Sequence, residues 1–468
     1  HRDLHSFPTR RSSDLVGLAE ARKIDSPASF FVGKRTAGSL AVTGSLLATV
    51  LGGSNTLGVA GLGYSRGLVG GWWLLCGALC LLLFSFWLAA RVREFGSFTI
   101  AEILGRQYSS NAVRLAASVI ICTAWVGIVA GQASAAGHLL SALWPGRLDL
   151  MILASGIVFT CYTVLGGQYS IIRTDVCQFA VILGGIVLVV AFGVNAAGGV
   201  AGVLAAAPPQ SLSFPFSEAF GPADLLMYFL FVGMAYLVGP DIYSRTLSAR
   251  DTGTARRSAA IAAGALAVLA LTMALVGVLA RILLPDIPAD KAFPSLALHV
   301  LPDGLNGLVI AALLAAVMSS ADTCLLTAAT IIASDMVKPL CGDRLSDDRL
   351  VLLTRCTVVA LGAGSMLVAL KLQDIIAALL LAYTVYSGGV AMPLLLGFYA
   401  KKLRLNAAGA LCSIVAGGAA GLALKLGGQD QLLSLVFPLS LAALFGGSRW
   451  AAGRGVPALS RQRSGNSP

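Results

Sequence analysis

The stretch AALLAAVMSSADTCLLTAATIIASD, residues 311–335, decides the fold class. It is an apolar run long enough to cross a lipid bilayer, because a spanning helix needs about 20 residues. Its centre carries two adjacent hydroxyls, Ser319 and Ser320, and then a carboxylate, Asp322. Polar groups at membrane depth are costly and usually face a site or a pathway. The stretch therefore predicts a membrane helix that lines a functional site.

A second stretch, SLLATVLGGSNTLG, begins at Ser45 and reads as a spanning helix with an interruption. The interruption consists of Gly52, Gly53, Ser54 and Asn55. A broken helix frees backbone carbonyls, and hydroxyls on another helix can join them around a dehydrated cation. The two stretches together indicate an ion-coupled transporter.

The composition of the whole chain is typical of an integral membrane protein. The chain is 57% hydrophobic and 12% charged, with a mean hydropathy of +0.83. These values lie far outside the range of soluble globular domains. The net charge of +11 does not indicate nucleic acid, because the basic residues cluster in loops on one side of the predicted spans. The predicted partners are the lipid bilayer and a small solute, and the oligomeric state is left open.

Apolar runs predict an all-α integral membrane fold with about twelve spans. The predicted spans are 39–61, 67–90, 113–136, 148–166, 174–195, 223–243, 258–284, 304–334, 350–370, 374–399, 406–425 and 431–448. With residues 16–37 in the cytoplasm, 24 basic residues fall on that side and 6 on the other. The positive-inside rule therefore places the C-terminus in the cytoplasm, in a multi-pass protein of the cell inner (plasma) membrane.

The sixth predicted span is interrupted as well, at Gly233 and again at Gly239 and Pro240. By the predicted orientation, this span crosses the membrane in the direction opposite to the first. Interruptions at matching places in two halves indicate an inverted repeat with a binding site near the midplane. Spans 1–5 and 6–10 are therefore predicted to form two five-helix units.

The predicted segments follow from these spans. Residues 1–15 share neither composition nor pattern with the rest and are expected to be non-native, adaptor-like sequence, with a further helix missing before Val16. The predicted order is then a cytoplasmic lead-in at 16–38, the first repeat at 39–195, an external loop at 196–222, the second repeat at 223–399, two peripheral helices at 400–448 and a basic cytoplasmic tail at 449–468.

Four stretches resemble segments of the sodium:solute symporter family, in that family's order and spacing. They are SLLATVLGGSNTLGVAGLGYSRGL at 45–68, VLGGQYSIIRTDVCQ at 164–178, VGPDIYSRTLSARD at 238–251 and AAVMSSADTCLLTAATIIASD at 315–335. The likeness covers nearly all of residues 30–400. It implies the leucine-transporter-type fold with its inverted five-helix repeat, and sodium-driven uptake of small organic solutes.

The resemblance also implies a sodium site. Its ligands would be the carbonyls of Ala48, Leu51 and Ala316 and the hydroxyls of Ser319 and Ser320. Sodium is a hard cation that prefers such oxygens, so Na+ is the expected coupling ion, with no organic cofactor. The alternative is that both serines bond to their own helix or allow close helix packing. The pattern alone leaves proton coupling open.

Two acidic residues are further candidates. Asp175 resembles the family's acidic residue near the inner sodium exit, which in some members helps to form a second sodium site; the alternative is an interfacial acid paired with Arg173. Asp322 lies about one helical turn from Ser319. It is expected to brace a neighbouring helix, with tuning of the cation site as the alternative.

The resemblance places the solute against the interruption of the first span. The candidate solute-binding residues are Gly52, Gly53, Ser54, Asn55, Tyr236, Tyr383 and Tyr386. The alternative for each tyrosine is packing or an interfacial position. Residues 258–280 contain no counterpart of the lysine that sugar-transporting members use in the seventh span, which counts against sugars. The dipole at the interruption favours an amino acid or a carboxylate.

The predicted function is therefore a sodium-coupled symporter that imports a small organic solute by alternating access. The alternative is a transporter-like membrane sensor that binds solute and signals through a partner protein. No nucleotide-binding or hydrolase motif occurs in the sequence, so the chain is not expected to be an enzyme.

Overall fold

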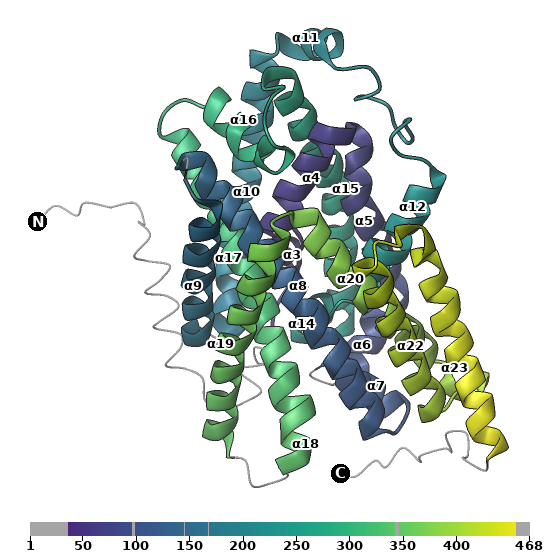
Figure 1. Ribbon diagram of the computed structural model, residues 1–468. Helices are drawn as coiled ribbons and strands as arrows, with labels where there is room; N and C mark the ends of the chain where they lie inside the picture. Colours follow the sequence, from purple (N-terminus) through teal and green to yellow (C-terminus); the bar gives the residue numbers. More distant parts are fainter. Residues whose placement is uncertain (1–35, 96–98, 145, 167, 342–345, 455–468) are drawn as a thin grey trace, which may run out of the picture.

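The computed structural model describes residues 36–95, 99–144, 146–166, 168–341 and 346–454, and it describes no side chains for 166–177, 340–341 and 347. The adaptor-like segment, nearly all of the lead-in and most of the basic tail lie outside these residues. Within the described part the chain forms helices and no β-strand beyond isolated bridges. The long helices run side by side as one bundle (Figure 1).

Most of the helices are joined by short turns, and the longest described connection, residues 207–221, lies between α11 and α12. They are α3 Ser39–Val50, α4 Gly53–Arg66, α5 Trp72–Trp87, α6 Ala89–Phe95, α7 Ile100–Gln107, α8 Asn111–Leu143, α9 Leu148–Gly166, α10 Gln168–Ala196, α11 Gly199–Ala206, α12 Pro222–Tyr228, α13 Met234–Val238, α14 Pro240–Ser248, α15 Thr252–Leu283, α16 Ala292–Val300, α17 Leu305–Ile331, α18 Lys338–Cys341, α19 Asp347–Leu372, α20 Ile375–Gly397, α21 Ala400–Leu403, α22 Ala407–Leu426 and α23 Val436–Gly453.

By length and composition, 11 helical runs in the described residues can cross a membrane. One of these runs, Gly53–Trp87, contains both α4 and α5. The two helices are separated at Gly67, whose φ of 80° is readily adopted only by glycine. The prediction of about twelve spans counted them separately, and α3 with α4 as one broken span. The all-α membrane fold is confirmed.

The first span is broken between α3 and α4, as predicted. α3 ends at Val50, α4 begins at Gly53, and Gly52 between them is extended, with φ −49° and ψ 158°. A Cβ on Gly52 would lie 2.1 Å from Ser320 Oγ, and one on Gly53 would lie 1.9 Å from Val317 Cγ2. Glycine is therefore needed here because the break touches α17 directly.

The sixth span is also broken, and more elaborately. A π-helical turn, Phe229–Gly233, joins α12 to α13. The chain then becomes extended at Gly239, with ψ 127°, and Pro240 opens α14. Proline suits the first position of a helix because its missing N–H would have no partner there. The predicted interruption at Gly239 and Pro240 is present in the structure, and Gly233 ends the π-helical turn.

Helix α15 runs alongside both halves of the broken first span. At one end, Ser39 Oγ of α3 and Ser258 Oγ of α15 form a hydrogen bond of 3.2 Å. At the other end, a Cβ on Gly63 would lie 2.2 Å from the Ala274 carbonyl oxygen, and one on Gly277 would lie 2.4 Å from the Tyr64 nitrogen. The backbones of α4 and α15 thus pack directly, as glycine permits between membrane helices.

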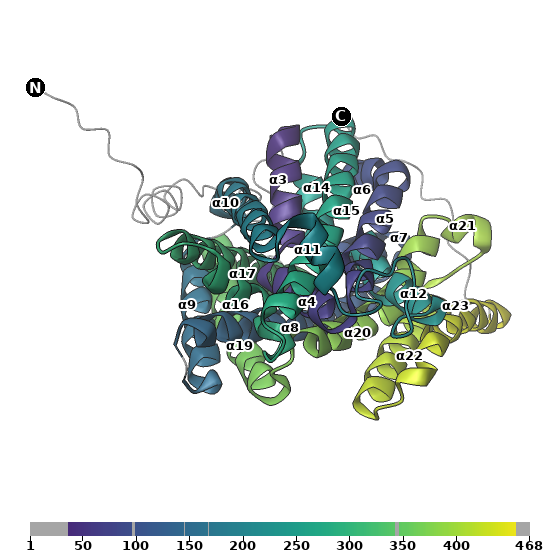
Figure 2. The ribbon, with the colours of Figure 1, turned by 90° about the horizontal axis from the view of Figure 1, so that it is seen from above.

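The helices divide into a central and a peripheral set. In α17 and in α20, 72% of the most apolar window is buried inside the protein, against 22% in α19 and 28% in α9. Seen from above, α4, α8 and α17 lie in the middle of the bundle, while α22 and α23 lie at one side (Figure 2). The apolar outer surfaces of the peripheral helices suit contact with lipid.

Candidate functional site

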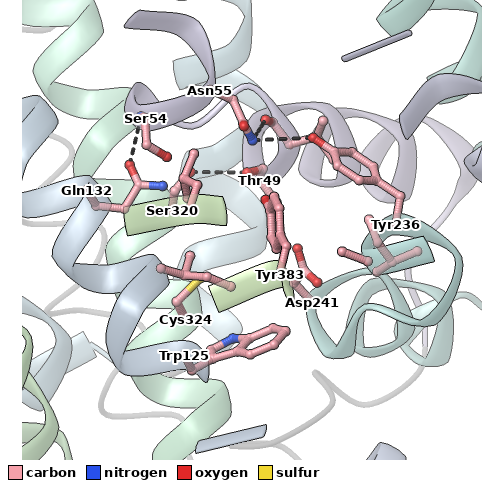
Figure 3. Close-up of a pocket in the computed structure, with 15 residues that line it drawn as sticks. Thr49, Ser54, Asn55, Trp125, Gln132, Tyr236, Asp241, Ser320, Cys324 and Tyr383 are labelled. Carbon is pink, nitrogen blue, oxygen red and sulfur yellow. Dashed lines mark hydrogen bonds between the residues drawn. The ribbon is translucent and has the colours of Figure 1, made fainter. Parts of the chain in front are cut away.

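A cavity of about 30 Å³ lies where the two broken spans meet (Figure 3). Seven helices contribute to its wall: α3, α4, α8, α13, α14, α17 and α20. The lining residues are Thr49, Val50, Ser54, Asn55, Trp125, Ile128, Gln132, Ala235, Tyr236, Asp241, Ile242, Ser320, Cys324, Leu379 and Tyr383. Residues more than 300 positions apart in the chain therefore share one central site.

Asn55, in the first turn of α4, connects the two breaks. Its side-chain amide donates to the Val50 carbonyl at 2.8 Å and to the Tyr236 hydroxyl at 3.3 Å. Its side-chain oxygen accepts from Trp73 Nε1 at 3.0 Å. The sequence predicted a residue that faces the solute; the structure places Asn55 on the cavity wall, with its polar atoms tied to α3, α13 and α5.

The residues of the predicted sodium site lie near the first break. Ala48 and Leu51 on one side, and Ala316, Ser319 and Ser320 on the other, are all buried. Ser320 Oγ donates to the Thr49 carbonyl at 3.2 Å, which joins α17 to the end of α3.

One of the predicted carbonyl ligands already has a hydrogen-bond donor: the Leu51 carbonyl accepts from Thr56 Oγ1 at 2.7 Å. No group of three His, Cys, Asp or Glu residues that could hold a metal exists in the described part of the chain. Carbonyl and hydroxyl oxygens are the atoms at the first break that could act as metal ligands, and they suit a hard monovalent cation.

Two hydroxyls on the cavity wall have no hydrogen-bond partner among the described residues. These are Thr49 Oγ1 and Ser54 Oγ. Thr49 is 5% exposed and Ser54 is 0% exposed. The Ser54 backbone N–H, in contrast, donates to Gln132 Oε1 at 3.1 Å. Buried polar atoms are normally paired, so these two hydroxyls are available for a ligand that enters the cavity.

The three candidate tyrosines differ in position. Tyr236 and Tyr383 line the cavity. Tyr386 does not: its hydroxyl donates to the Val238 carbonyl at the end of α13, and its ring packs against Trp125 with centroids 5.0 Å apart. The structure therefore places Tyr386 behind the cavity wall, where it holds the second break.

The two glycines among the solute candidates, Gly52 and Gly53, are also absent from the cavity wall. They pack against Ser320 and Val317 instead.

The structure describes the side chain of only one of the two further acidic candidates, Asp322 and Asp175. Asp322 accepts a hydrogen bond of 2.5 Å from Thr163 Oγ1, which joins α17 to α9. This contact agrees with the interpretation that Asp322 braces a neighbouring helix. Asp175 lies in α10, and its side chain is outside the described residues.

Asp241 is the one residue on the cavity wall that sequence analysis should have singled out. It follows the Gly239-Pro240 break and opens the first turn of α14. The signal was present in the sequence: a carboxylate directly after a helix interruption in a membrane span is costly and marks a site. That it faces the first break, however, follows only from the three-dimensional arrangement.

Two broken helices that meet at a central cavity inside a membrane bundle define a secondary transporter. Comparison with known proteins identifies the family of transporters. The model of the sodium:solute symporter family matches residues 30–417, and the chain belongs to this family. Members of the family are sodium-coupled secondary transporters rather than enzymes, and the resemblance seen in the four sequence stretches is confirmed.

Individual relatives cover most of the chain. The sodium/pantothenate symporter of Escherichia coli is 29% identical over 405 residues, which is 83% of this chain and 82% of the relative. The sodium/glucose cotransporter of Vibrio parahaemolyticus is 28% identical over 460 residues, 86% of this chain and 81% of the relative.

A solved structure shows the same fold. A Na+-coupled sialic acid symporter, in a substrate-bound outward-open state, matches with a TM-score of 0.79 at 19% identity over 96% of this chain and 97% of its own. At this identity the likeness shows the fold alone, and the predicted leucine-transporter-type fold is thereby confirmed.

Proposed function

We propose that the protein imports a small organic solute, an amino acid or a carboxylate, together with Na+ by alternating access. The observation that supports this best is the meeting of both helix breaks with the hydroxyl of Ser320 around one central cavity. A carboxylate is also what the pantothenate relative carries, as its name states. The protein would lie in the inner (plasma) membrane, with the basic C-terminal tail in the cytoplasm.

Sodium would bind between the first span and α17. The carbonyls of Ala48, Leu51 and Ala316 and the hydroxyls of Ser319 and Ser320 would hold it, and Asp175 would serve a second sodium site or the exit path. Because Ser320 already bonds the Thr49 carbonyl at the end of α3, a cation here would fix the position of the first break. The first break forms one wall of the cavity, so occupancy by sodium would prepare that wall for the solute.

The driving force is sufficient for accumulation. One sodium ion that enters down a potential of 100 mV supplies about 2.3 kcal/mol. A tenfold sodium gradient adds about 1.4 kcal/mol. At one-to-one coupling the two together support roughly 500-fold accumulation of a neutral solute.

Uptake into proteoliposomes tests the proposal. The purified chain is reconstituted into vesicles, and radiolabelled amino acids or carboxylates are added outside under an inward sodium gradient, with potassium and choline gradients as controls. Uptake in sodium alone supports the symporter. Equal uptake in all three salts contradicts sodium coupling, and sodium-dependent binding with flux at the background level indicates the sensor instead.

A further inference from the structure

The Asp241 carboxylate gives the cavity a net negative wall. Among the 15 residues that line the cavity, Asp241 is the only Asp, Glu, Lys, Arg or His. The others are apolar, aromatic, hydroxyl or amide residues. In a water-poor environment one unbalanced charge dominates the choice of ligand, because its interactions are weakly screened.

The nearest positive charge is committed elsewhere. Arg245 follows Asp241 by one turn of α14 and attracts its carboxylate at a distance. Its guanidinium, however, donates to Thr323 Oγ1 at 2.6 Å and to Ser244 Oγ at 3.2 Å. Asp241 Oδ1 lies over Gly239, 2.6 Å from the position that a Cβ on this glycine would take. Asp241 lies in the first turn of α14, which has no side-chain cap, and keeps acceptor capacity for a ligand.

The opposite wall of the cavity offers the complementary chemistry. The N-terminus of α4, a helix of 14 residues, reaches the cavity at Ser54 and Asn55. A helix N-terminus attracts anions. The hydroxyls of Ser54 and Thr49, buried and without a partner among the described residues, stand on the same wall as donors. One side of the cavity can therefore bind a carboxylate group of the ligand, and the opposite side carries the carboxylate of Asp241.

We propose that Asp241 binds the ammonium group of the solute, so that the transporter selects zwitterionic amino acids over carboxylates that lack an ammonium group. This inference rests on the proposed function and narrows its substrate class. A zwitterion would satisfy both walls, with its carboxylate at the α4 N-terminus and its ammonium at Asp241, once the cavity of about 30 Å³ widens to admit it. The rings of Trp125, Tyr236 and Tyr383 line the same cavity and add cation–π attraction for the ammonium group.

A simple carboxylate is disfavoured for a physical reason. It brings a second negative charge into the cavity beside Asp241, and neither charge is then neutralised by a lining residue. The substitution Asp241→Asn removes this repulsion. The substitution should therefore weaken the binding of amino acids and leave the binding of carboxylates unchanged or slightly tighter. General damage to the pocket does not produce this pattern.

Ligand binding to the purified full chain in nanodiscs tests the assignment. Thermal stability is screened with the proteinogenic amino acids, with the matched carboxylate of each hit that lacks the amino group, and with pantothenate, each in sodium chloride and in choline chloride. Affinities of the hits are then measured for the wild type and for Asp241→Asn, with Asp241→Glu as the conservative variant.

The control variant is Asp251→Asn, which also replaces an aspartate at a helix N-terminus. Asp251 caps α15 through the Thr254 N–H at 2.6 Å and is exposed, away from the cavity. Asp251→Asn retains the cap of α15 because the asparagine side-chain oxygen accepts the same hydrogen bond. If Asp241→Asn proves unstable, the ratio of amino acid to des-amino affinity in the wild type and in Asp241→Glu still decides the question.

We expect at least one amino acid to bind in sodium at least tenfold more tightly than its des-amino carboxylate. We also expect Asp241→Asn to lower the amino acid affinity at least tenfold, while Asp251→Asn changes it less than twofold. If the tightest ligand is pantothenate or another carboxylate and Asp241→Asn leaves it unaffected, the inference is overturned and the proposed function stands. If no probe binds in a sodium-dependent way, the proposed function fails, and the inference fails with it.

Discussion

The two helix breaks solve the same problem with different chemistry. The first break is made by glycines, carries no charge and lies against α17, where Ser320 bonds the Thr49 carbonyl. The second is made by Gly239 and Pro240 and leads directly into the carboxylate of Asp241. Neutral oxygens suit a sodium ion, and a single carboxylate suits a charged organic group. The comparison indicates that the first break serves the ion and the carboxylate of the solute, and that the second break serves the ammonium group of the solute.

The largest effect is expected from bulk at the first break. Gly53→Leu places a side chain where Val317 Cγ2 already lies 1.9 Å from the Cβ position, so α4 and α17 must separate. We expect loss of sodium-dependent binding and uptake, together with a lower thermal midpoint. Gly264→Leu in α15, where no atom lies within 4 Å of the Cβ position, is the control. Wild-type uptake by Gly53→Leu would show that the close contact is dispensable.

Removal of one hydroxyl should weaken the ion without destroying the site. Ser320→Ala deletes one oxygen near the first break, and we expect the apparent sodium affinity to fall at least several-fold, on the order of 1 kcal/mol. Solute affinity should fall at low sodium and recover at high sodium. Ser118→Ala, whose hydroxyl bonds the Arg114 carbonyl of its own helix, is the matched control. Unchanged sodium dependence would assign Ser320 to packing.

Asn55 offers a way to separate the two breaks. Asn55→Ala removes the bonds to Val50, Tyr236 and Trp73 that join them. We expect the solute affinity to fall about tenfold, or about 1.4 kcal/mol, and the sodium affinity to fall less. The factor by which sodium raises solute affinity should shrink, which is measured by solute titrations at several sodium concentrations. An equal loss for both ligands would contradict the division between ion and solute.

The smallest effect on ligand binding is expected outside both breaks. Thr163→Val removes the hydroxyl that bonds Asp322 and leaves the volume nearly unchanged. If Asp322 braces α17 against α9, stability should fall by about 1–3 kcal/mol, with sodium affinity changed less than twofold. Thr123→Val, whose hydroxyl bonds only the Val119 carbonyl of its own helix, is the control. A clear shift in sodium affinity would instead assign Asp322 to the cation site.

Much of the architecture could be read from the sequence because the bilayer imposes it. Apolar runs give the spans, and glycine or Gly-Pro in such a run gives the breaks at Gly52 and Gly239. What lies next to each break could not be read. Tyr386 follows Tyr383 by three residues, yet one lines the cavity and the other supports Val238 behind it. The role of Asp241 becomes apparent only because the first break lies across the same cavity. Residues far apart in sequence form this arrangement.

The unbroken α15 packs along both halves of the interrupted first span, and its contacts with α3 and with α4 differ in kind. The C-terminal half of the first span, α4, meets α15 backbone to backbone at Gly63 and Gly277, with no side chain between them that could rearrange. The N-terminal half, α3, is joined through hydroxyls, Ser39 with Ser258, and a single neutral hydrogen bond contributes little net stability. Bending at Gly52 should therefore swing α3 while α4 stays with α15. We expect α3 to be the moving part of the first span, and hydrogen exchange to be faster in α3 than in α4.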